Sequence, residues 1–280
     1  MPLITELLDK LKGARRFTKL NVQWGYNNVR IRDGDQWKAA FKTNRGLFEP
    51  TVMFFGMCNS PATFQAMMDD IFSDMIDECI IIIYMDDIFI FAPDETTLTK
   101  HTKKVLACLR NNNLFLKPAK CEFNKTKVEY LGMVIEKGKI SMDSGKLKGI
   151  QDWPTPTSVM QIRGFLGFGN FYRRFIHGFS ELVKPLNNLL KKDKKFHWTF
   201  DCQLAFDELK KQFTKEPVLT MPDQSQPFQI ETDALKYTTG VVLTQLDLNG
   251  NRHPVSFLSK TFSPTERNYK IYDQERLAII

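Results

Sequence analysis

Cysteine is scarce and scattered in this sequence. The five cysteines include no Cys-x-x-Cys pair that would suggest a metal knuckle, and their odd number argues against a disulfide framework. We therefore expect reduced thiols in an intracellular protein. The four histidines are equally scattered, so each is expected to be structural rather than a metal ligand.

Long apolar runs are also missing. The longest one, around Cys79–Tyr84, is far shorter than the ~20 residues that a membrane span needs. No charged start followed by an apolar core opens the chain, so we expect no secretory signal and no membrane partner. Hydrophobic residues make up 42% of the chain and charged residues 25%, which excludes disorder, collagen and coiled coil as overall descriptions.

Cations are absent from one long stretch. Residues 46–99 contain ten acids and no Lys or Arg, although the whole chain has a net charge of +7. The rest of the chain, with 39 Lys and Arg against 22 Asp and Glu, carries +17. Such a basic body predicts a polyanionic partner. For the acids between Asp69 and Glu78, a solvated helix face is the preferred interpretation.

Local patterns predict a mixed α+β chain. Apolar periodicity indicates helices over 3–11, from Ser60-Pro61 onward, 98–111 and 202–213, and a helical stripe over 159–176. The predicted strands are 17–22, 28–31, 38–43, 79–84, 88–92, 228–232, 240–245 and 255–258, with a hairpin of 125–135 and 139–141 around Lys137-Gly138. Ser158 with Gln161, and Ser263 with Glu266, form capping boxes that predict helix starts.

Proline-rich connectors suggest how the chain is divided. Trp153-Pro154-Thr155-Pro156-Thr157 is stiff, and residues 216–227 hold three prolines. We therefore expect boundaries there, which divide the chain into residues 1–150, 151–215 and 216–280.

Two adjacent carboxylates, Asp86 and Asp87, stand between aliphatic strands. At the tip of a buried hairpin they repel each other and lose hydration, and a divalent metal would offset both costs. The alternative is a pair of turn-forming aspartates in water. The pattern by itself leaves both interpretations open.

Tyr84-Met85-Asp86-Asp87 resembles the Tyr-x-Asp-Asp hairpin of reverse transcriptases, and other blocks resemble that family in its order and spacing. They are Phe17–Val22 with Gly25-Tyr26, Phe55–Gln65, Tyr130-Leu131-Gly132, and Phe165-Leu166-Gly167 through Asn170–Phe175. The last block is similar to the thumb segment of gypsy-type LTR retrotransposon polymerases. The resemblance covers almost the whole chain.

The resemblance implies a right-hand polymerase palm with an antiparallel sheet and incomplete fingers in 1–150, and a helical thumb and connection in 151–215. A truncated ribonuclease-H-like α/β domain would follow in 216–280. The implied activity is RNA-directed DNA polymerase: a primer 3′-hydroxyl attacks a nucleoside triphosphate, helped by two Mg²⁺ or Mn²⁺ ions. The implied partners are an RNA or DNA template with its primer, deoxynucleoside triphosphates and other parts of a polyprotein, in a cytoplasmic particle or the nucleus.

The resemblance also assigns residues. Asp86 and its less central neighbour Asp87 would bind metal, and Tyr26, Phe55 and Gly56 would contact the nucleotide, with Tyr26 as a steric gate against a ribose 2′-hydroxyl. The residues implied to contact nucleic acid are Gln65, Tyr130, Leu131, Gly132, Arg163, Tyr172, Arg173 and Arg174; the basic Lys117, Lys120, Lys125 and Lys127 also suit a duplex. The alternatives are an ordinary half-buried aromatic for Tyr26 and solvated helix faces for the cations.

Position 21 departs from the family. Reverse transcriptases have a metal-bridging Asp there, whereas this chain has Asn21. An amide offers one neutral oxygen where a carboxylate offers two oxygens and a charge. We therefore expect weaker metal binding and weaker transition-state stabilisation. A non-catalytic, nucleic-acid-binding remnant of a decayed element is the alternative function.

The last part resembles the start of a ribonuclease H domain, in which Asp233 and Glu275 would be metal ligands. Composition alone makes Asp233 a turn residue and Glu275 a surface acid. The family needs further carboxylates later in its sequence, and its fingers lie mostly upstream of Met1. We therefore expect a fragment or a decayed copy, with residues 228–280 the least stable part and inactive on an RNA–DNA hybrid.

Overall fold

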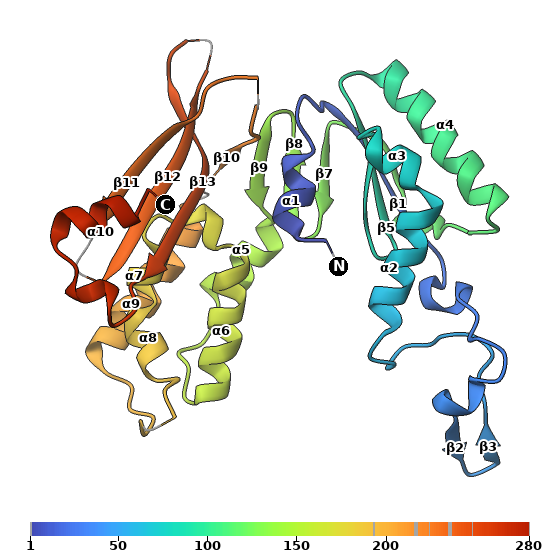
Figure 1. Cartoon of the computed structure of the whole chain (residues 1–280), viewed down its shortest axis with the longest axis horizontal. Helices are drawn as coiled ribbons and strands as arrows, with labels where there is room; N and C mark the ends of the chain where they lie inside the picture. Colours follow the sequence, from blue (N-terminus) through green and yellow to red (C-terminus); the bar gives the residue numbers. More distant parts are fainter. Residues whose placement is uncertain are drawn as a thin grey trace. The chain divides into compact units, whose positions relative to one another are not determined.

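The computed structural model describes residues 2–192, 194–215, 218–223, 225–234, 237–247 and 249–279. The chain forms two compact units. The first comprises residues 1–131 with 136–138, and the second comprises 132–135 with 139–280. Helices and antiparallel sheets are mixed in both, which confirms the predicted fold class (Figure 1). No helix in these described ranges is long and apolar enough to cross a membrane.

The first unit is built on an antiparallel sheet with the strand order β4-β5-β1-β6. Its strands are β1 (Arg16–Asn21), β4 (Ile81–Tyr84), β5 (Asp87–Ala92) and β6 (Glu122–Lys125). Helices α2 (Ser60–Ile71), α3 (Ser73–Asp77) and α4 (Glu95–Asn111) cover one face of this sheet (Figure 1). Every second strand residue, such as Leu20 and Ile88, enters the apolar core between sheet and helices.

The opposite face of this sheet carries a second set of residues. Phe17 and Phe89 stack with ring centroids 5.5 Å apart, and Tyr130 stacks on Phe89 at 4.5 Å. Tyr130 ends β7 (Lys127–Tyr130) and is fully buried. The remaining elements of the unit are α1 (Ile4–Asp9), the hairpin of β2 (Phe41–Thr43) and β3 (Gly46–Phe48), and the 3-10 helices η1 (Gly25–Asn28), η2 (Gln36–Ala39) and η3 (Pro118–Lys120).

Several predicted elements in this unit are wrong in detail. Residues 28–31 form no strand, because Trp24 adopts a left-handed conformation (φ 55°) and Asn28 closes a turn by donating to the carbonyls of Gln23, Trp24 and Gly25. The predicted strand 38–43 is half 3-10 helix, and the helix from Ser60 breaks at Phe72. The predicted strand 125–135 is interrupted, because Leu131 (φ 50°) and Gly132 (φ 75°) form a left-handed turn.

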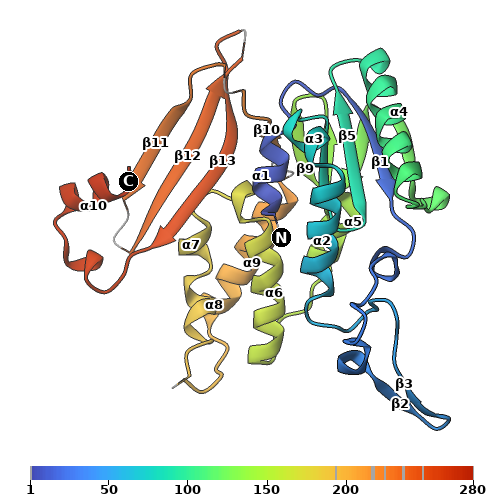
Figure 2. The same ribbon diagram turned by 45° about the vertical axis from the view of Figure 1, so that its right-hand side comes forward.

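The second unit combines a helical part with two sheets, as Figure 2 also shows. The hairpin of β8 (Met133–Glu136) and β9 (Lys139–Met142) turns at Lys137-Gly138, as predicted, and β10 (Leu219–Thr220) extends it. The helices are α5 (Ser144–Gln151), α6 (Val159–Phe171), η4 (Arg173–Phe175), α7 (Phe179–Leu182), α8 (Lys184–Asn188) and α9 (Phe200–Thr214). Ser158 accepts from the Gln161 amide, which confirms the predicted cap of α6.

The last part is a meander of β11 (Gln229–Ala234), β12 (Thr238–Leu246) and β13 (Arg252–Thr261). The Ser263–Glu266 capping box forms its two reciprocal hydrogen bonds, but it caps the 3-10 turn η5 (Glu266–Asn268). The α-helix, α10 (Ile271–Leu277), begins only afterwards, so the predicted helix start is wrong. The predicted boundary at 216–227 includes residues 216, 217 and 224, which lie outside the described ranges.

Candidate active site

The two aspartates lie at the turn that joins β4 and β5, beside the end of β1. Asn21 and Asp87 are paired across β1 and β5. The Asn21 Nδ2 donates to Asp86 Oδ2 at 3.0 Å and to Asp87 Oδ1 at 2.9 Å. Residue 21 therefore lies beside Asp86, where the sequence resemblance had located it, and its side chain is only 5% exposed.

Strand alternation determines which way this site faces. Asn21 and Asp87 share a face of the sheet with the Lys19–Phe89 and Phe17–Phe91 pairs. Leu20 and Ile88 point the other way, into the core beneath the helices. Asp87 thus lies on the sheet face opposite to α2, α3 and α4, whereas Asp86 stands in the turn itself, beside a cavity that Phe64 of α2 also lines.

Gln65 supports the turn from beneath. Its Oε1 accepts from the Met85 backbone N–H at 2.7 Å, and its Nε2 donates to the Ile83 carbonyl at 3.3 Å and to Asp69 Oδ1 at 2.8 Å. Met85 has φ 55°, a left-handed conformation that side chains rarely adopt, so the turn needs external support. Because Gln65 is 2% exposed, its position is that of a support for the turn, while its predicted contact with nucleic acid stays a prediction.

Aromatic rings flank the turn. Tyr26 contacts Phe55 and Phe64 edge-on, with ring centroids 4.9 and 5.8 Å away. A cavity of about 100 Å³ lies between these three rings and Gly25, Met85 and Asp86. Burial, and secondarily the Asp86 charge, raise the pKa of Tyr26. Of the other nucleotide residues assigned by resemblance, Phe55 is 80% exposed and Gly56 adopts φ 109° on the surface.

Gly25 and Phe64 were not predicted as site residues. A Cβ on Gly25 would lie 3.3 Å from the Phe64 ring and 3.6 Å from the Asp86 Cβ, so the chain passes close to the turn at this point. Phe64 lies in the Phe55–Gln65 block that resembles the family, but the sequence shows it as an apolar position of a helix and assigns it no role in the site. Only its distance from Tyr26 in space, not its spacing in the chain, indicates its position beside the site.

The donor set can hold one cation more readily than two. Carboxylate oxygens are the ligands that Mg²⁺ prefers, and Asp86 and Asp87 supply them side by side. The third position presents an amide, which is neutral. In the ranges that the structure describes, no group of three His, Cys, Asp or Glu side chains is arranged to hold a metal.

Tyr130 is fully buried, whereas Leu131 and Gly132 of the same turn are half-buried. Among the described residues the Tyr130 hydroxyl has no hydrogen-bond partner, and burial raises its pKa far above the usual range. The Tyr172 hydroxyl donates to the Gly132 carbonyl at 2.7 Å, and a Cβ on Gly132 would approach that hydroxyl to 2.9 Å. Tyr130 and Tyr172 are therefore packed inside the protein, and their predicted contact with nucleic acid stays a prediction.

The three arginines assigned by resemblance lie in different environments. Arg163 is exposed on α6. Arg173 donates to the Ser259 carbonyl and to Ser180 Oγ, and its guanidinium lies 5.6 Å from the Phe179 ring centroid. Arg174 is 8% exposed. Of the three, Arg163 is the one whose guanidinium is open to a phosphate.

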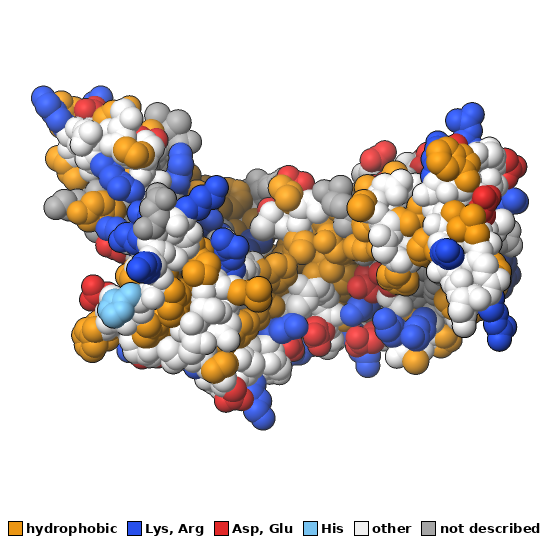
Figure 3. Space-filling view, turned by 90° about the horizontal axis from the view of Figure 1, so that it is seen from below, with side chains coloured by type: hydrophobic (Ala, Val, Ile, Leu, Met, Phe, Trp, Pro, Cys, Tyr) orange, Lys and Arg blue, Asp and Glu red, His pale blue; other side chains and the backbone are white. Residues whose placement is uncertain are grey.

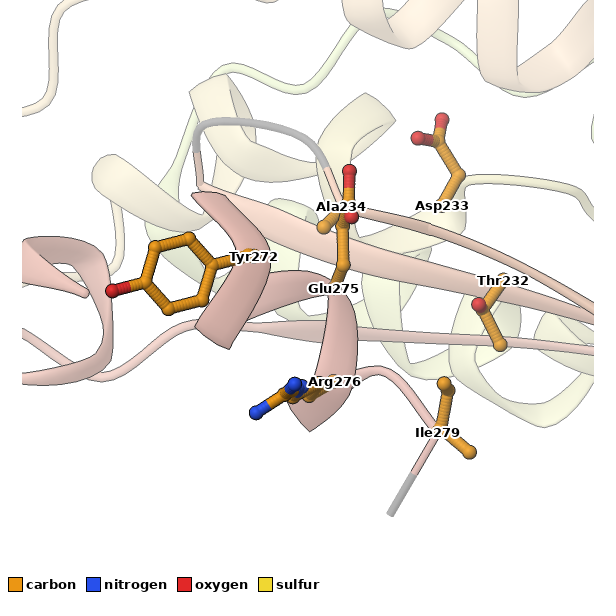
Figure 4. A pocket seen from close by; sticks show the side chains of 7 residues that line it. All are labelled: Thr232, Asp233, Ala234, Tyr272, Glu275, Arg276 and Ile279. Carbon is orange, nitrogen blue, oxygen red and sulfur yellow. The ribbon is translucent and has the colours of Figure 1, made fainter. Parts of the chain in front are cut away.

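Asp233 and Glu275 are brought together at the C-terminal end of the chain. Both line a pocket of about 320 Å³ between β11 and α10, with Thr232, Tyr272 and Arg276 (Figure 4). In Figure 4 both carboxylates rise on the same side of the strand, whereas Arg276 points to the other side. Both acids are exposed, and no hydrogen bond or ion pair of its carboxylate within the described structure holds either side chain in place.

Known protein families match two parts of the chain. Residues 2–135 match the family described as "Reverse transcriptase (RNA-dependent DNA polymerase)". Residues 198–280 match the "RNase H-like domain found in reverse transcriptase". The Transposon Tf2-3 and Tf2-7 polyproteins of Schizosaccharomyces pombe are each 38% identical over all 280 residues. The chain spans 21% of the length of these relatives.

Solved structures share the fold. The foamy viral protease-reverse transcriptase in complex with RNA/DNA hybrid matches 99% of this chain and 37% of its own, with a TM-score of 0.86 and 22% identity. A second structure of that protein, in complex with double-stranded DNA, matches the whole chain and 49% of its own, with a TM-score of 0.87 and 22% identity. At this identity the likeness shows the fold alone.

Proposed function

We propose that this chain, which belongs to the reverse transcriptase family of gypsy-type LTR retrotransposon polyproteins, carries a nucleotidyl-transfer site at Asn21, Asp86 and Asp87 whose activity Asn21 lowers. Residues 1–150 would be the palm, 151–215 the thumb and connection, and 216–280 the ribonuclease-H-like part. The substrates would be a primer on an RNA or DNA template and deoxynucleoside triphosphates.

The observation that supports the proposal is the pair of hydrogen bonds from Asn21. Its amide N–H groups satisfy one oxygen of each aspartate at 2.9–3.0 Å. A family Asp at this position would instead repel both carboxylates, and a divalent cation would relieve that repulsion. Asn21 thus removes one anionic ligand and also engages the two that remain.

Divalent metal ions are the cofactors on which this family generally depends. Asp86 and Asp87 would hold a Mg²⁺ or Mn²⁺ ion here, and such an ion would stabilise the oxygens of the transferred phosphate. The chain's own residues position the reaction: Gln65 holds the turn, and Tyr26 with Phe55 forms an aromatic wall beside Asp86. A nucleotide sugar against Tyr26 would meet a bulky, protonated phenol.

The polynucleotide partner is supported by charge. Outside residues 46–99 the chain carries +17, and Lys and Arg side chains are interspersed with apolar ones on the face shown in Figure 3. Lys117, Lys120, Lys125 and Lys127 are exposed in the first unit, as is Arg163 in the second. Phosphate contacts of this kind give affinity without sequence preference.

The second candidate is a non-catalytic nucleic-acid-binding remnant, and the closed hydrogen bonding at Asn21 favours it. Primer extension separates the two. The chain, its Asn21→Asp variant and an Asp86→Asn control are assayed with Mg²⁺ and with Mn²⁺. We expect slow extension by the chain, faster extension by Asn21→Asp and none by Asp86→Asn. Equal extension by all three would contradict the site assignment, and binding of primer–template without extension by any of them would leave the remnant as the function.

The C-terminal pair is proposed as part of a ribonuclease H site. Asp233 and Glu275 share one pocket, as the resemblance implies for two ligands of a metal. Two-metal hydrolysis needs more anionic ligands than these two. We therefore expect the chain as given not to cleave the RNA of an RNA–DNA hybrid.

A further inference from the structure

The outer face of α4 carries a stripe of five exposed residues, three of which are cations. Thr96, Lys100, Lys103, Ala107 and Arg110 recur every three or four residues and are all exposed. This spacing places them on one side of the helix, opposite to the buried Leu98, Val105 and Leu109. No acid stands among them, because the acids of α4 are confined to its first turn.

In the part of the chain that the structure describes, the three cations of the stripe have no acidic partner. Across the described residues, no ion pair includes Lys100, Lys103 or Arg110, whereas the neighbouring Lys104 pairs with Glu78 at 2.8 Å. Like charges at this helical spacing repel and destabilise the helix slightly. An anionic partner would reverse that cost.

The stripe is bordered by two hollows. One lies beside the first half of α4 and is lined by Thr96, Thr99, Lys100 and Lys103 together with Glu95. The other, of about 320 Å³, includes Leu106 and Arg110 of the helix and Phe115 of the segment that follows it. Phe115 is 64% exposed and Leu106 is 37% exposed. Exposed apolar side chains, Leu106 and Phe115, therefore lie beside Arg110, at the end of the stripe.

The three cations of this surface lie on the far side of α4 from the sheet, whereas Phe115 belongs to the segment beside the end of β1, where its carbonyl accepts from the Gln23 N–H at 2.7 Å. The buried side of α4 packs against Leu20, Ile88 and Ile90, which face away from Asn21 and Asp87 in the same strands. The sheet and the thickness of the helix therefore lie between these cations and the Asp87 carboxylate. A duplex bound over the Asp87 face of the sheet leaves Lys100, Lys103 and Arg110 uncovered.

We infer that the outer face of α4 is a second binding surface, which takes a single-stranded polynucleotide. A flexible strand supplies regularly spaced phosphates for Lys100, Lys103 and Arg110, and its unpaired bases supply flat apolar faces for Phe115. A duplex would hide those faces. Such binding rests on the proposed function only in that the partner is again a polynucleotide, and it requires no nucleotidyl transfer.

The test measures the anisotropy of a labelled 20-residue oligodeoxythymidine, with the active-site face saturated by an unlabelled blunt DNA duplex. Replacing Lys100, Lys103 and Arg110 together by Glu should abolish most of this binding. It should also lower the slope of log affinity against log salt concentration by about two, because each of the three lost phosphate contacts contributes ~0.7 to that slope. Phe115→Ser should weaken binding about tenfold and leave the salt slope unchanged.

The control is a triple variant with the same change of charge, Lys137, Lys146 and Lys148 to Glu, at exposed positions outside α4. It should bind the oligonucleotide nearly as well as the unchanged chain does. Thermal unfolding confirms that each variant is folded, and separate titration of the duplex should give unchanged affinity for the α4 variant. Equal losses in both triple variants, or an acidic peptide that binds α4 while the oligonucleotide does not, would overturn the inference.

Discussion

The two acidic sites of this chain differ in how they are supported. Asp86 and Asp87 lie at a turn that Gln65, Asn21 and the Val22 amide hold by hydrogen bonds. Asp233 and Glu275 lie exposed around an open pocket, and within the described structure no hydrogen bond to either carboxylate positions it. The first site is held in place by hydrogen bonds and has a neutral amide at its third position, whereas the second has two carboxylates that no side-chain hydrogen bond among the described residues positions. The positioning of the carboxylates and the number of negative charges are therefore separate requirements. Variants at the first site test the charge, and variants at the second test the positioning.

The largest effect on stability is expected at Gln65, the support of the first site. Gln65→Ala removes the acceptor of the Met85 N–H and a donor to Ile83, so the free energy of unfolding should fall by about 3 kcal/mol. Urea unfolding measures this. Gln65→Met keeps the volume of the side chain without its hydrogen bonds. Full stability in that variant would show that packing, not hydrogen bonding, holds the turn.

A smaller loss is expected at Arg173. Arg173→Ala removes hydrogen bonds to Ser259 and Ser180 and the contact with Phe179, which should cost about 2 kcal/mol of unfolding free energy. The matched variant is Arg163→Ala on the exposed face of α6. It should change stability by less than about 0.5 kcal/mol while it lowers the salt slope of duplex binding by about one. A reversed pattern would show that the two arginines have been assigned the wrong roles.

Two buried tyrosines should respond in opposite directions. Tyr130→Phe removes a buried hydroxyl without a partner, so the protein should gain about 1 kcal/mol. Tyr172→Phe removes the hydrogen bond to the Gly132 carbonyl, so the protein should lose about 1 kcal/mol. Thermal unfolding of both variants makes the comparison. Destabilisation by Tyr130→Phe would mean that this hydroxyl is satisfied in solution.

The smallest effect is expected at the C-terminal pair. Asp233→Asn alters an exposed side chain, so stability should change by less than about 0.5 kcal/mol. Neither the chain nor this variant should cleave an RNA–DNA hybrid, because two carboxylates are too few for two-metal hydrolysis. Hybrid cleavage by the purified chain that Asp233→Asn abolishes would contradict this part of the account.

Sequence reasoning succeeded where neighbours in the chain are neighbours in space. The strands around Asp86 and Asp87 and the cap at Ser158 were predicted from local patterns and are present in the structure. The strand predicted at 28–31 failed, because Trp24 enters a left-handed conformation that no periodicity reveals. The α-helix predicted to start at Ser263 failed because the same cap also suits a 3-10 turn.

The candidate site was predictable in part, and only through the resemblance. Nothing local in the sequence links Asn21 to Asp86, which lies 65 residues away. The support by Gln65 is a side-chain contact with the backbone across 20 residues, and the pattern of α2 shows it only as one more helix position. In the sequence, Arg173 cannot be told apart from an arginine that binds phosphate. In the structure its guanidinium donates to Ser180 and Ser259 instead.

We infer that Asn21 replaces a metal ligand at a turn that is otherwise intact. The most direct measurement is the shift in melting temperature that Mg²⁺ causes in the chain and in its Asn21→Asp variant. Without metal, Asn21→Asp should melt lower, because it loses two hydrogen bonds and adds a third carboxylate. With millimolar Mg²⁺ it should recover and exceed the shift seen in the unchanged chain, since bound metal stabilises the folded state. An equal Mg²⁺ shift in both proteins would contradict the account.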